Sequence, residues 1–368
     1  MWDPRTSRGS FPADACLGVN TYGHSPGIRQ AMCRFASHDC FERSAADLER
    51  FVGVGVCKQT LRAAVLREGE SVSADRAGGK IAPAFTAADA GTVGPEGLPG
   101  PTRLNASMDG VFVRMVTQAE QDRRLEKAVR KRAERGRDAG GAHPLRVRTG
   151  HAEAFKEMKV GAFYDQSRRH MHTFVTPGGP DEAGELLARH AALLRFDQAD
   201  QRGAVFDGAP WIRTQFRERL PTVDLMLLDF YHLSEHLHGG GGSAFADAED
   251  ALAWVSKRSE EFKAGQAATA LAAIRAMRTK AATPGTQETL RRLDEYVTAR
   301  LDMLDYARAI AQGRDIGSGP MESQCKTHTM RVDRPGAKWL ATNAASIMNL
   351  AALRASGQWD SHWKKLAA

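Results

Sequence analysis

Five short β-prone segments are the sequence feature that most strongly constrains the fold of this chain. They cover residues 108–116, 158–165, 171–177, 203–209 and 223–229. A segment with helical periodicity, residues 181–196, lies between the third and the fourth of them. Consecutive strands tend to pair as a meander, whereas strands separated by a helix are joined by a crossover connection. The order therefore predicts an α/β sheet in which an early meander is extended by two later strands.

Three strands, a helix and two further strands is the order of an RNase H-like fold. The spacing places the first part of this core in residues 105–242. Residues 243–312 have helical periodicity throughout and are expected to form an all-helical insertion, divided at Thr283-Pro284-Gly285. Residues 313–368 are expected to return to the core as C-terminal helices.

The N-terminal residues 1–70 are predicted to form a small helical domain. Apolar residues recur at helical spacing over 41–52, a break with two glycines follows, and a basic helix resumes over 57–68 with Lys58, Arg62 and Arg67 at polar positions. This is the outline of a helix-turn-helix, and equally of any helical hairpin. Residues 71–104 contain six glycines and four prolines, which predicts a linker.

Composition limits the setting of the protein. The net charge of +7 over 368 residues is mild, and no apolar stretch approaches the roughly 20 residues that a membrane helix needs. The N-terminus lacks an apolar signal-peptide core, so a cytoplasmic protein without a membrane partner is expected. The five cysteines form no CxxC pair and are expected to be reduced thiols.

Three acids are candidates for catalysis. Asp109-Gly110 lies at the start of the first strand, and Asp207-Gly208 at the end of the fourth. A buried carboxylate is costly unless it is paired or binds a metal, and carboxylate oxygens are ligands that Mg²⁺ prefers; Asp-Gly is also a common turn. Glu322 follows Gly319-Pro320 in the first turn of a helix, either as a third acid or as an ordinary N-terminal helix acid.

A competing motif is present at His232-Leu233-Ser234-Glu235-His236, which matches the H-x-x-E-H pattern of zinc proteases. The spacing puts both imidazoles on one helical face. That interpretation needs a third ligand downstream, and it leaves Asp109, Asp207 and Glu322 without a role.

Taken together, the motifs resemble the DDE transposases of bacterial insertion sequences, in particular the ISKra4 family. The resemblance covers nearly the whole chain, and Asp229-Phe230-Tyr231-His232 is similar to the D-x-x-H signature of Mutator-like transposases. Four segments carry it: Met108-Asp109-Gly110, residues 207–212, residues 228–237, and residues 317–326. The stretch 17–26, Gly336, Trp339, Trp359 and Trp363 also match.

The resemblance implies that Asp109, Asp207 and Glu322 form a catalytic triad holding two Mg²⁺ ions, with Mn²⁺ as a substitute. Asp229 and His232 would orient the site or serve a structural role. The implied activity is metal-dependent cleavage of the element's ends and transfer of the freed 3′-OH into target DNA, by a dimer or larger assembly on double-stranded DNA. The alternatives are a DNA-binding derivative without catalysis and, less favoured, the zinc protease.

Two basic surfaces are candidates for DNA binding. One is the second helix of the N-terminal domain, with Lys58, Arg62 and Arg67. The other is the basic run 123–148, which is alternatively a solvated helix face. Two cations beyond the third acid, Lys326 and Arg331, are expected to face a phosphate backbone. The cations assigned to DNA within the basic run are Arg124, Lys127, Arg130, Lys131 and Arg132.

Overall fold

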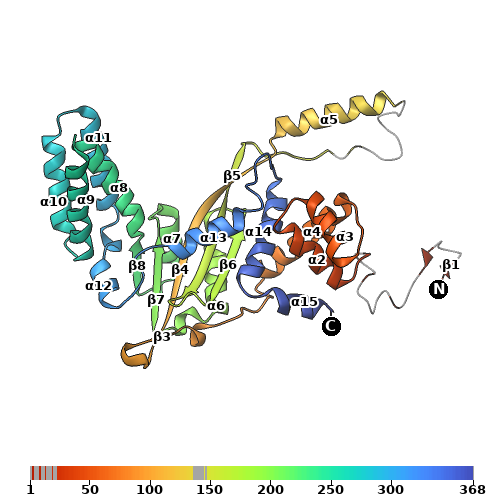
Figure 1. Cartoon of the computed structure of the whole chain (residues 1–368), viewed down its shortest axis with the longest axis horizontal. Helices are drawn as coiled ribbons and strands as arrows, with labels where there is room; N and C mark the ends of the chain where they lie inside the picture. Colours follow the sequence, from red (N-terminus) through yellow and green to blue (C-terminus); the bar gives the residue numbers. More distant parts are fainter. Residues whose placement is uncertain are drawn as a thin grey trace.

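A computed structural model describes residues 2–3, 8–9, 13, 19, 23–135, 145 and 147–367 of the chain (Figure 1). It is a mixed α/β protein with one central sheet. Within these residues, no helix combines the length and the apolar character needed to cross a membrane.

The central sheet has the strand order β6-β5-β4-β7-β8. The strand β4 pairs antiparallel with β5, which pairs antiparallel with β6, whereas β7 joins β4 in parallel and β8 joins β7 in parallel. A short strand, β3 (Gly91–Val93), pairs with the beginning of β4. The predicted meander and the two added strands are therefore present. Their bounds are β4 Pro99–Arg114, β5 Phe155–Asp165, β6 Met171–Thr176, β7 Gln201–Phe206 and β8 Leu225–Leu228.

Side chains of β4 alternate between two apolar layers, as strand geometry requires. Leu104, Ala106 and Met108 face a core shared with α6 (Pro180–Leu193) and α7 (Pro210–Arg219). The other face of the sheet is covered by α13 (Gly319–Thr329) and α14 (Ala341–Ala355), and it forms a second core with the N-terminal helices. The position of Asp109, one residue after Met108, turns its side chain toward the face that α13 covers.

The N-terminal helices are α2 (Pro26–Ala36), α3 (Phe41–Val52) and α4 (Lys58–Ala77). The turn after α3 begins at Gly53, whose φ of 74° is in the left-handed region that glycine adopts without strain. The expected helix, short turn and basic second helix are present. However, α4 is longer than predicted because its apolar side packs along α14 over most of its length.

Residues 71–104 differ from the linker that their composition predicts. Residues up to Ala77 continue α4, and β3 and the beginning of β4 follow. Phe85, Ala87 and Ala90 are buried in the core on the α6 side of the sheet. Small residues and prolines were thus compatible with packing, because this segment crosses the end of the sheet in short buried pieces.

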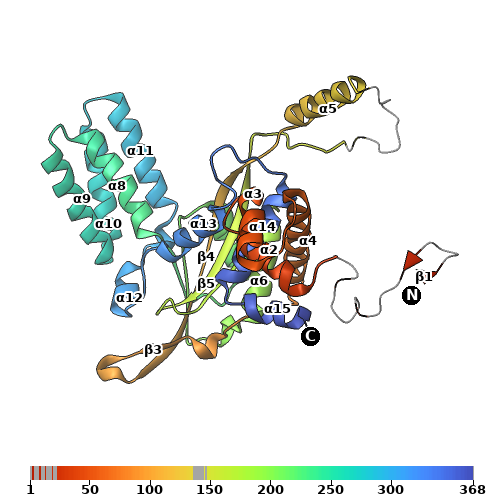
Figure 2. The same cartoon turned by 45° about the vertical axis from the view of Figure 1, so that its right-hand side comes forward.

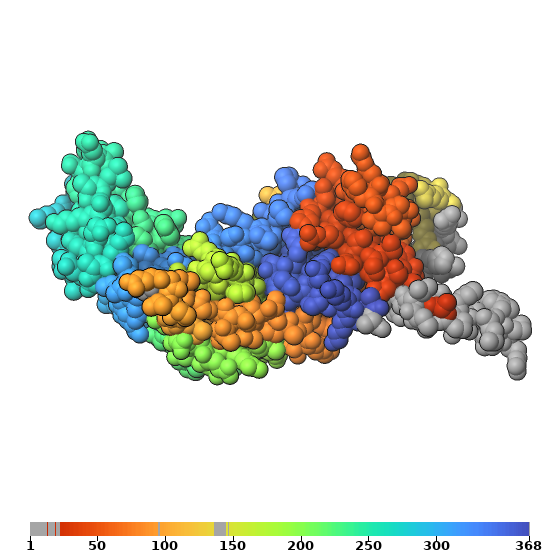
Figure 3. All heavy atoms as spheres, turned by 60° about the horizontal axis from the view of Figure 1, so that its bottom comes forward, coloured from red at the N-terminus to blue at the C-terminus, as the bar shows by residue number. Residues whose placement is uncertain are grey.

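The region expected as an all-helical insertion forms a lobe at one end of the molecule (Figures 1 and 2). The side-chain hydroxyl of Thr283 caps α11 by accepting from the Thr286 amide at 3.1 Å, at the predicted break. Figure 3 shows this lobe and the N-terminal helices rising at opposite ends of an elongated molecule. The helices of the lobe are α8 Phe230–Ala244, α9 Ala248–Lys263, α10 Ala267–Lys280, α11 Pro284–Thr298 and α12 Tyr306–Ala311.

The C-terminal α15 (Trp359–Ala367) packs against α2. The basic α5 (Gln118–Ala133) projects from the end of the sheet, and each of its side chains is exposed or half-buried (Figure 1). Two two-residue strands, β1 (Trp2–Asp3) and β2 (Arg8–Gly9), pair near the N-terminus. Cys33, Cys40, Cys57 and Cys325 are free thiols, as predicted, and Cys16 lies outside the described residues.

Candidate functional site

Asp109 lies on the central strand β4, opposite Val160 of β5. One of its carboxylate oxygens accepts from the Gly110 amide at 2.7 Å, and the other is 3.4 Å from the Cys325 thiol of α13. Burial raises the pKa of Asp109, and the nearby charge of Asp207 raises it further. The Asp109 carboxylate is thus desolvated and repelled by a second carboxylate. A cation bound between the two acids would offset both costs.

Asp207 follows the end of β7, the strand next to β4. Its side chain accepts from the Ala209 amide at 2.8 Å. The helical lobe holds its backbone: the Tyr296 hydroxyl donates to the carbonyl of Asp207 at 3.1 Å, and Arg300 donates to the carbonyl of Gly208 at 3.0 Å. The inserted helices therefore fix the loop that presents Asp207.

Gly208 is required in this loop for two reasons. Its φ of 79° is in the left-handed region. A Cβ atom at this position would lie 2.4 Å from the Arg300 Nε and 2.7 Å from a methyl group of Leu228. Asp207 and Gly208 lie in the loop between β7 and α7, whereas Asp109 and Gly110 lie within β4. The loop places the Asp207 carboxylate within electrostatic reach of Asp109.

Asp229 links α8 to the beginning of α13. One oxygen of its carboxylate accepts from the Tyr231 amide at 2.6 Å, and the other accepts from the Ser318 amide at 2.7 Å and from the Ser318 hydroxyl. Burial alone would raise the pKa of Asp229, but the hydrogen bonds from His232, Ser318 and Tyr231 outweigh it and lower the pKa to about 2. Asp229 is therefore an ionised carboxylate that binds the N-terminal end of α13, the helix that carries Glu322.

His232 stands beside the acids as a cation. The carboxylate of Asp229 lies 3.7 Å from the His232 Nδ1 and raises the pKa of the imidazole to about 8, with further contributions from Asp207 and Glu235. The charge of His232 in turn lowers the pKa of Asp109. A protonated imidazole thus partly neutralises the two aspartates.

Replacing Asp229 by Asn is expected to lower the pKa of His232 from about 8 toward 6.5, its usual value. Because the folded state favours the imidazolium, the pair's contribution to stability is complete below pH about 6.5 and is lost as the pH rises through about 8. NMR titration of ¹⁵N-labelled histidine measures the shift. His38 serves as the internal control, because burial and the charges of Arg354, Arg34 and Arg334 lower its pKa, and neither Asp229 nor His232 contributes. An unchanged His232 titration in Asp229→Asn contradicts this account.

Glu322 lies in the first turn of α13, with its side chain largely exposed. Its carboxylate forms an ion pair with Lys326, one turn further along, at 2.8 Å. Cys325, three residues after Glu322, contacts Asp109; burial raises the pKa of its thiol, and the charges of Asp109 and Glu322 raise it further. Asp109 and Asp207 are thus close enough for their charges to interact, whereas the Glu322 carboxylate is largely exposed and paired with Lys326. Among the described residues, no three His, Cys, Asp or Glu side chains are grouped closely enough to hold a metal ion.

The two histidines of the H-x-x-E-H motif lie on α8, as its spacing predicts, but each has another partner. His232 pairs with Asp229, and the His236 ring stacks on Tyr296 with their centroids 3.8 Å apart. The guanidinium of Arg300 lies 3.9 Å from the centroid of the same tyrosine ring. Burial lowers the pKa of His236, and the charge of Arg300 lowers it further, so this environment disfavours an additional cation at His236.

The cations expected to bind DNA are divided among several surfaces. On the N-terminal helices, Lys58 pairs with Glu42 at 3.4 Å, Arg62 is half-buried, and Arg67 is exposed. Lys326 pairs with Glu322. In the basic run, Arg124 pairs with Glu120 at 2.9 Å and Arg130 with Glu134 at 3.7 Å, Lys127 and Lys131 are exposed, and Arg132 is half-buried. Arg137, Asp138 and Arg146 of the same run lie outside the described residues.

Arg331 differs most from its expected role. It is 5% exposed, its Nε donates to the carbonyl of Ala36 at 3.2 Å, and its guanidinium lies 5.0 Å from the ring centroids of both Phe41 and Trp339. It therefore joins the C-terminal segment to the N-terminal helices and does not face a phosphate backbone on an open surface. Its charge is buried because two aromatic faces and a carbonyl replace water.

Sequence reasoning missed the residues that hold the site in place. Tyr296 and Arg300 come from the inserted lobe, about 90 residues after the loop that they hold, and Ser318 fixes the start of α13. Cys325 was treated only as a packed thiol. Its position three residues after Glu322, on the same side of the helix, was the one signal in the sequence that could have placed it near the acids.

No protein-family model matches the chain, and a search of curated proteins found no match.

Proposed function

We propose that this protein is a DDE-type DNA transposase, which cleaves the ends of its element and joins the freed 3′-OH to target DNA. The observation that carries the proposal is the approach of Asp109 and Asp207 at neighbouring parallel strands, close enough for one charge to raise the pKa of the other. The helix bearing Glu322 packs on the same face of the sheet through Cys325.

The fold that we propose is RNase H-like, interrupted by the helical lobe after β8. The antiparallel meander β4–β5–β6 and the parallel additions β7 and β8 support this assignment. The strands β4 and β7 are parallel neighbours in this sheet, so an acid on β4 and an acid just after β7 lie on adjacent strands. The N-terminal helices are proposed as a DNA-binding domain.

The donor set fits magnesium, because the carboxylates of Asp109 and Asp207 are hard oxygen ligands, each held by a backbone amide one or two residues further along the chain. Bound Mg²⁺ supplies a nucleophilic oxygen at neutral pH and stabilises the leaving oxygen of the phosphodiester. Asp109 and Asp207 would hold the metal, with Mn²⁺ as a substitute, and Glu322 would complete the site after leaving its ion pair with Lys326.

The other residues act by positioning. Asp229 binds Ser318 at the start of α13 and so positions the first turn of this helix, which carries Glu322, relative to the ends of the strands. His232 carries a positive charge beside Asp207 and limits the repulsion between the acids. Tyr296 and Arg300 fix the Asp207 loop from the lobe. Because transposition joins two ends, the active form is proposed to be a dimer or larger assembly on double-stranded DNA.

The zinc-protease alternative is less supported, because both histidines of its motif have other partners. A DNA-binding derivative without catalysis has the same fold and differs only at the acids. The ion pair of Glu322 with Lys326 favours this second candidate, and a test at Glu322 decides between them.

Glu322→Gln is expected to reduce DNA cleavage at least about 100-fold, because it removes a metal ligand while keeping the size and helix position of the side chain. The substrate is a linear fragment carrying this gene with its native flanking DNA on both sides, incubated with Mg²⁺ or with EDTA. Strand breaks are mapped on a denaturing gel.

Glu260→Gln is the matched control, because it makes the same substitution at another exposed glutamate with a helical lysine partner, Lys263, in the lobe. It is expected to keep cleavage within about threefold of the wild type, since exposed pairs contribute little to stability and this glutamate has no role at the acidic site. Mg²⁺-dependent cleavage by wild type that persists in Glu322→Gln excludes Glu322 from the site. Wild-type binding without any cleavage identifies the inactive derivative.

A further inference from the structure

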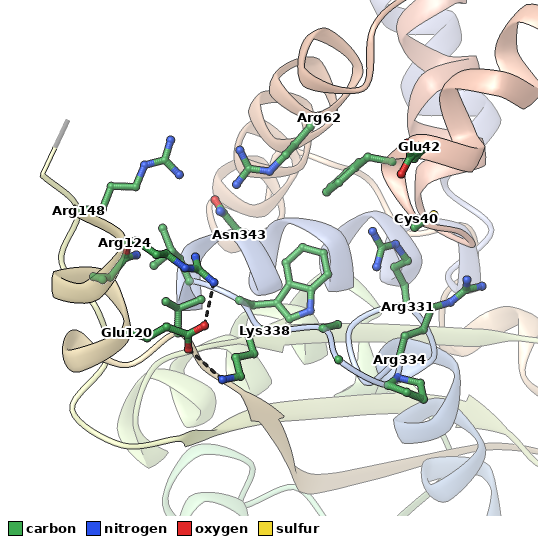
Figure 4. A pocket seen from close by; sticks show the side chains of 18 of the residues that line it. Cys40, Glu42, Arg62, Glu120, Arg124, Arg148, Arg331, Arg334, Lys338 and Asn343 are labelled. Atoms are coloured by element: carbon green, nitrogen blue, oxygen red, sulfur yellow. Dashed lines mark hydrogen bonds and ion pairs between the residues drawn. The ribbon is translucent and has the colours of Figure 1, made fainter. Parts of the chain in front are cut away.

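A cavity of about 940 Å³ opens where three distant parts of the chain meet. Its walls are the beginning of α3 with Arg62 of α4, the first turns of α5 together with Arg148, and the segment 334–343 before and within α14 (Figure 4). The acidic site described above lies outside this cavity.

The cavity is strongly basic. Seven positively charged side chains line it, against two glutamates. One of these glutamates, Glu120, is already engaged with Arg124 and Lys338, each at 2.9 Å. The lining cations are Arg43, Arg62, Arg124, Arg148, Arg331, Arg334 and Lys338. A concave surface with low-dielectric walls and one sign of charge concentrates anions.

Two of these cations face one another. Figure 4 shows the guanidinium groups of Arg62 and Arg148 directed toward each other across the cavity. Within the described residues, neither has a carboxylate partner. Burial lowers the pKa of Arg62, and the charge of Arg148 lowers it further. Two guanidinium groups that repel each other in a partly desolvated space are stabilised by an anion between them, and guanidinium geometry matches phosphate oxygens.

One strand, β4, connects the cavity wall to the acidic site. The Trp339 amide in the cavity wall donates to the carbonyl of Arg114 at 3.0 Å, at the end of the strand that carries Asp109. Asp109 precedes Arg114 by five residues on this strand, so the backbones of the two residues are about 16 Å apart. At about 3.4 Å per nucleotide, this distance corresponds to about five nucleotides of one DNA strand.

We propose that this cavity binds the phosphate backbone of a DNA strand, with a phosphate group between the guanidinium groups of Arg62 and Arg148. The bound phosphate would lie about five nucleotides from the acidic site. The inference rests on the proposed function only in taking DNA as the carrier of the phosphates. The cavity combines three residues that the sequence singled out for DNA binding, Arg62, Arg124 and Arg331, with Arg148 from the end of the same basic run. Lys338 joins them, although the sequence assigned it no such role. It also explains why α5 and the N-terminal helices converge on the segment after α13.

The double variant Arg62→Gln/Arg148→Gln tests the proposal by fluorescence anisotropy with a labelled 30-base-pair DNA duplex of random sequence. The measurement is made in EDTA, so that binding is observed without cleavage. Affinity is expected to fall about 100-fold at low salt, about tenfold for each guanidinium–phosphate hydrogen-bonded pair that the substitutions remove. The slope of log affinity against log salt is expected to decrease by about two.

The matched control is Arg291→Gln/Arg292→Gln, which removes the same charge from the helical lobe, where both arginines pair with Glu288. It is expected to bind as the wild type does. Arg62→Lys/Arg148→Lys keeps the charge without the guanidinium fork and is expected to bind with intermediate affinity. Circular dichroism melting checks that each variant is folded.

Equal affinities and salt slopes for the cavity variant and the lobe variant overturn the proposal. Inorganic triphosphate serves as a competitor; if it displaces DNA as effectively per phosphate as unlabelled duplex does, the cavity binds a free phosphate chain and the proposal is also overturned. Loss of binding in the cavity variant supports the proposal even if wild type cleaves no DNA. Normal binding by the cavity variant of a protein that does cleave DNA leaves the proposed function intact and removes only the cavity.

Discussion

Replacing Asp109 and Asp207 together by Asn is expected to abolish Mg²⁺-dependent cleavage, with a loss of at least about 1,000-fold. The substitution keeps the volume of both side chains and the hydrogen bonds from the Gly110 and Ala209 amides, while removing the charge that holds a cation. Cleavage of the gene's flanking DNA is measured with purified protein, and binding of the same fragment by anisotropy.

The same double variant is expected to bind DNA unchanged and to melt at a higher temperature than the wild type. Burial and the charge of Asp207 raise the pKa of Asp109, so the ionised form opposes folding at neutral pH, and a neutral amide removes that cost. A wild-type cleavage rate in this variant rules out the acidic site. A lower melting temperature contradicts the electrostatic account of the site.

Arg29→Met is expected to destabilise the protein by about 3–5 kcal/mol, because it leaves the Glu68 carboxylate buried without its partner. The two side chains form an ion pair between α2 and α4, and both are almost completely buried. Loss of this pair loosens the N-terminal helices that are proposed to bind DNA. The free energy of unfolding is measured by urea denaturation followed by tryptophan fluorescence.

The double variant Arg29→Met/Glu68→Leu is expected to recover most of the lost stability, since a buried ion pair and a well-packed apolar pair of similar volume have similar stabilities. The double-mutant cycle isolates the coupling between the two positions. As a control, Lys58→Met breaks the exposed pair with Glu42 between α3 and α4 and is expected to cost less than about 1 kcal/mol. Comparable losses of stability in Arg29→Met and Lys58→Met contradict the role of burial.

The order of strands was predictable because its cause is local. Short runs rich in β-prone residues, such as 158–165 and 171–177, predict strands from local composition, and both are present as β5 and β6. The segment 71–104 was not predictable in the same way. Its glycines and prolines are typical of a linker, and only contacts of Phe85 and Ala90 with the sheet core decide that it is packed.

Asp109 and Asp207 were identifiable as candidates in the sequence because a carboxylate in an apolar strand is costly to bury unless it is paired or binds a metal, although an Asp-Gly pair is also a common turn. Their proximity depends on β7 pairing with β4, a contact between residues about 100 positions apart. The basic run around α5 was also visible in the sequence. The sequence does not show which cations of this run lie close to cations of other segments, because that depends on how the segments pack.

What the sequence determined by itself was therefore the set of elements and the chemical types at the acidic site, because periodicity, turns and charge are local properties of the chain. The tertiary structure alone decided that Tyr296 and Arg300 hold the Asp207 loop, that Arg331 is buried, and that Arg62 meets Arg148 across a basic cavity. Each of these contacts joins segments far apart in the chain, and their geometry follows from the packing of the helices on the sheet.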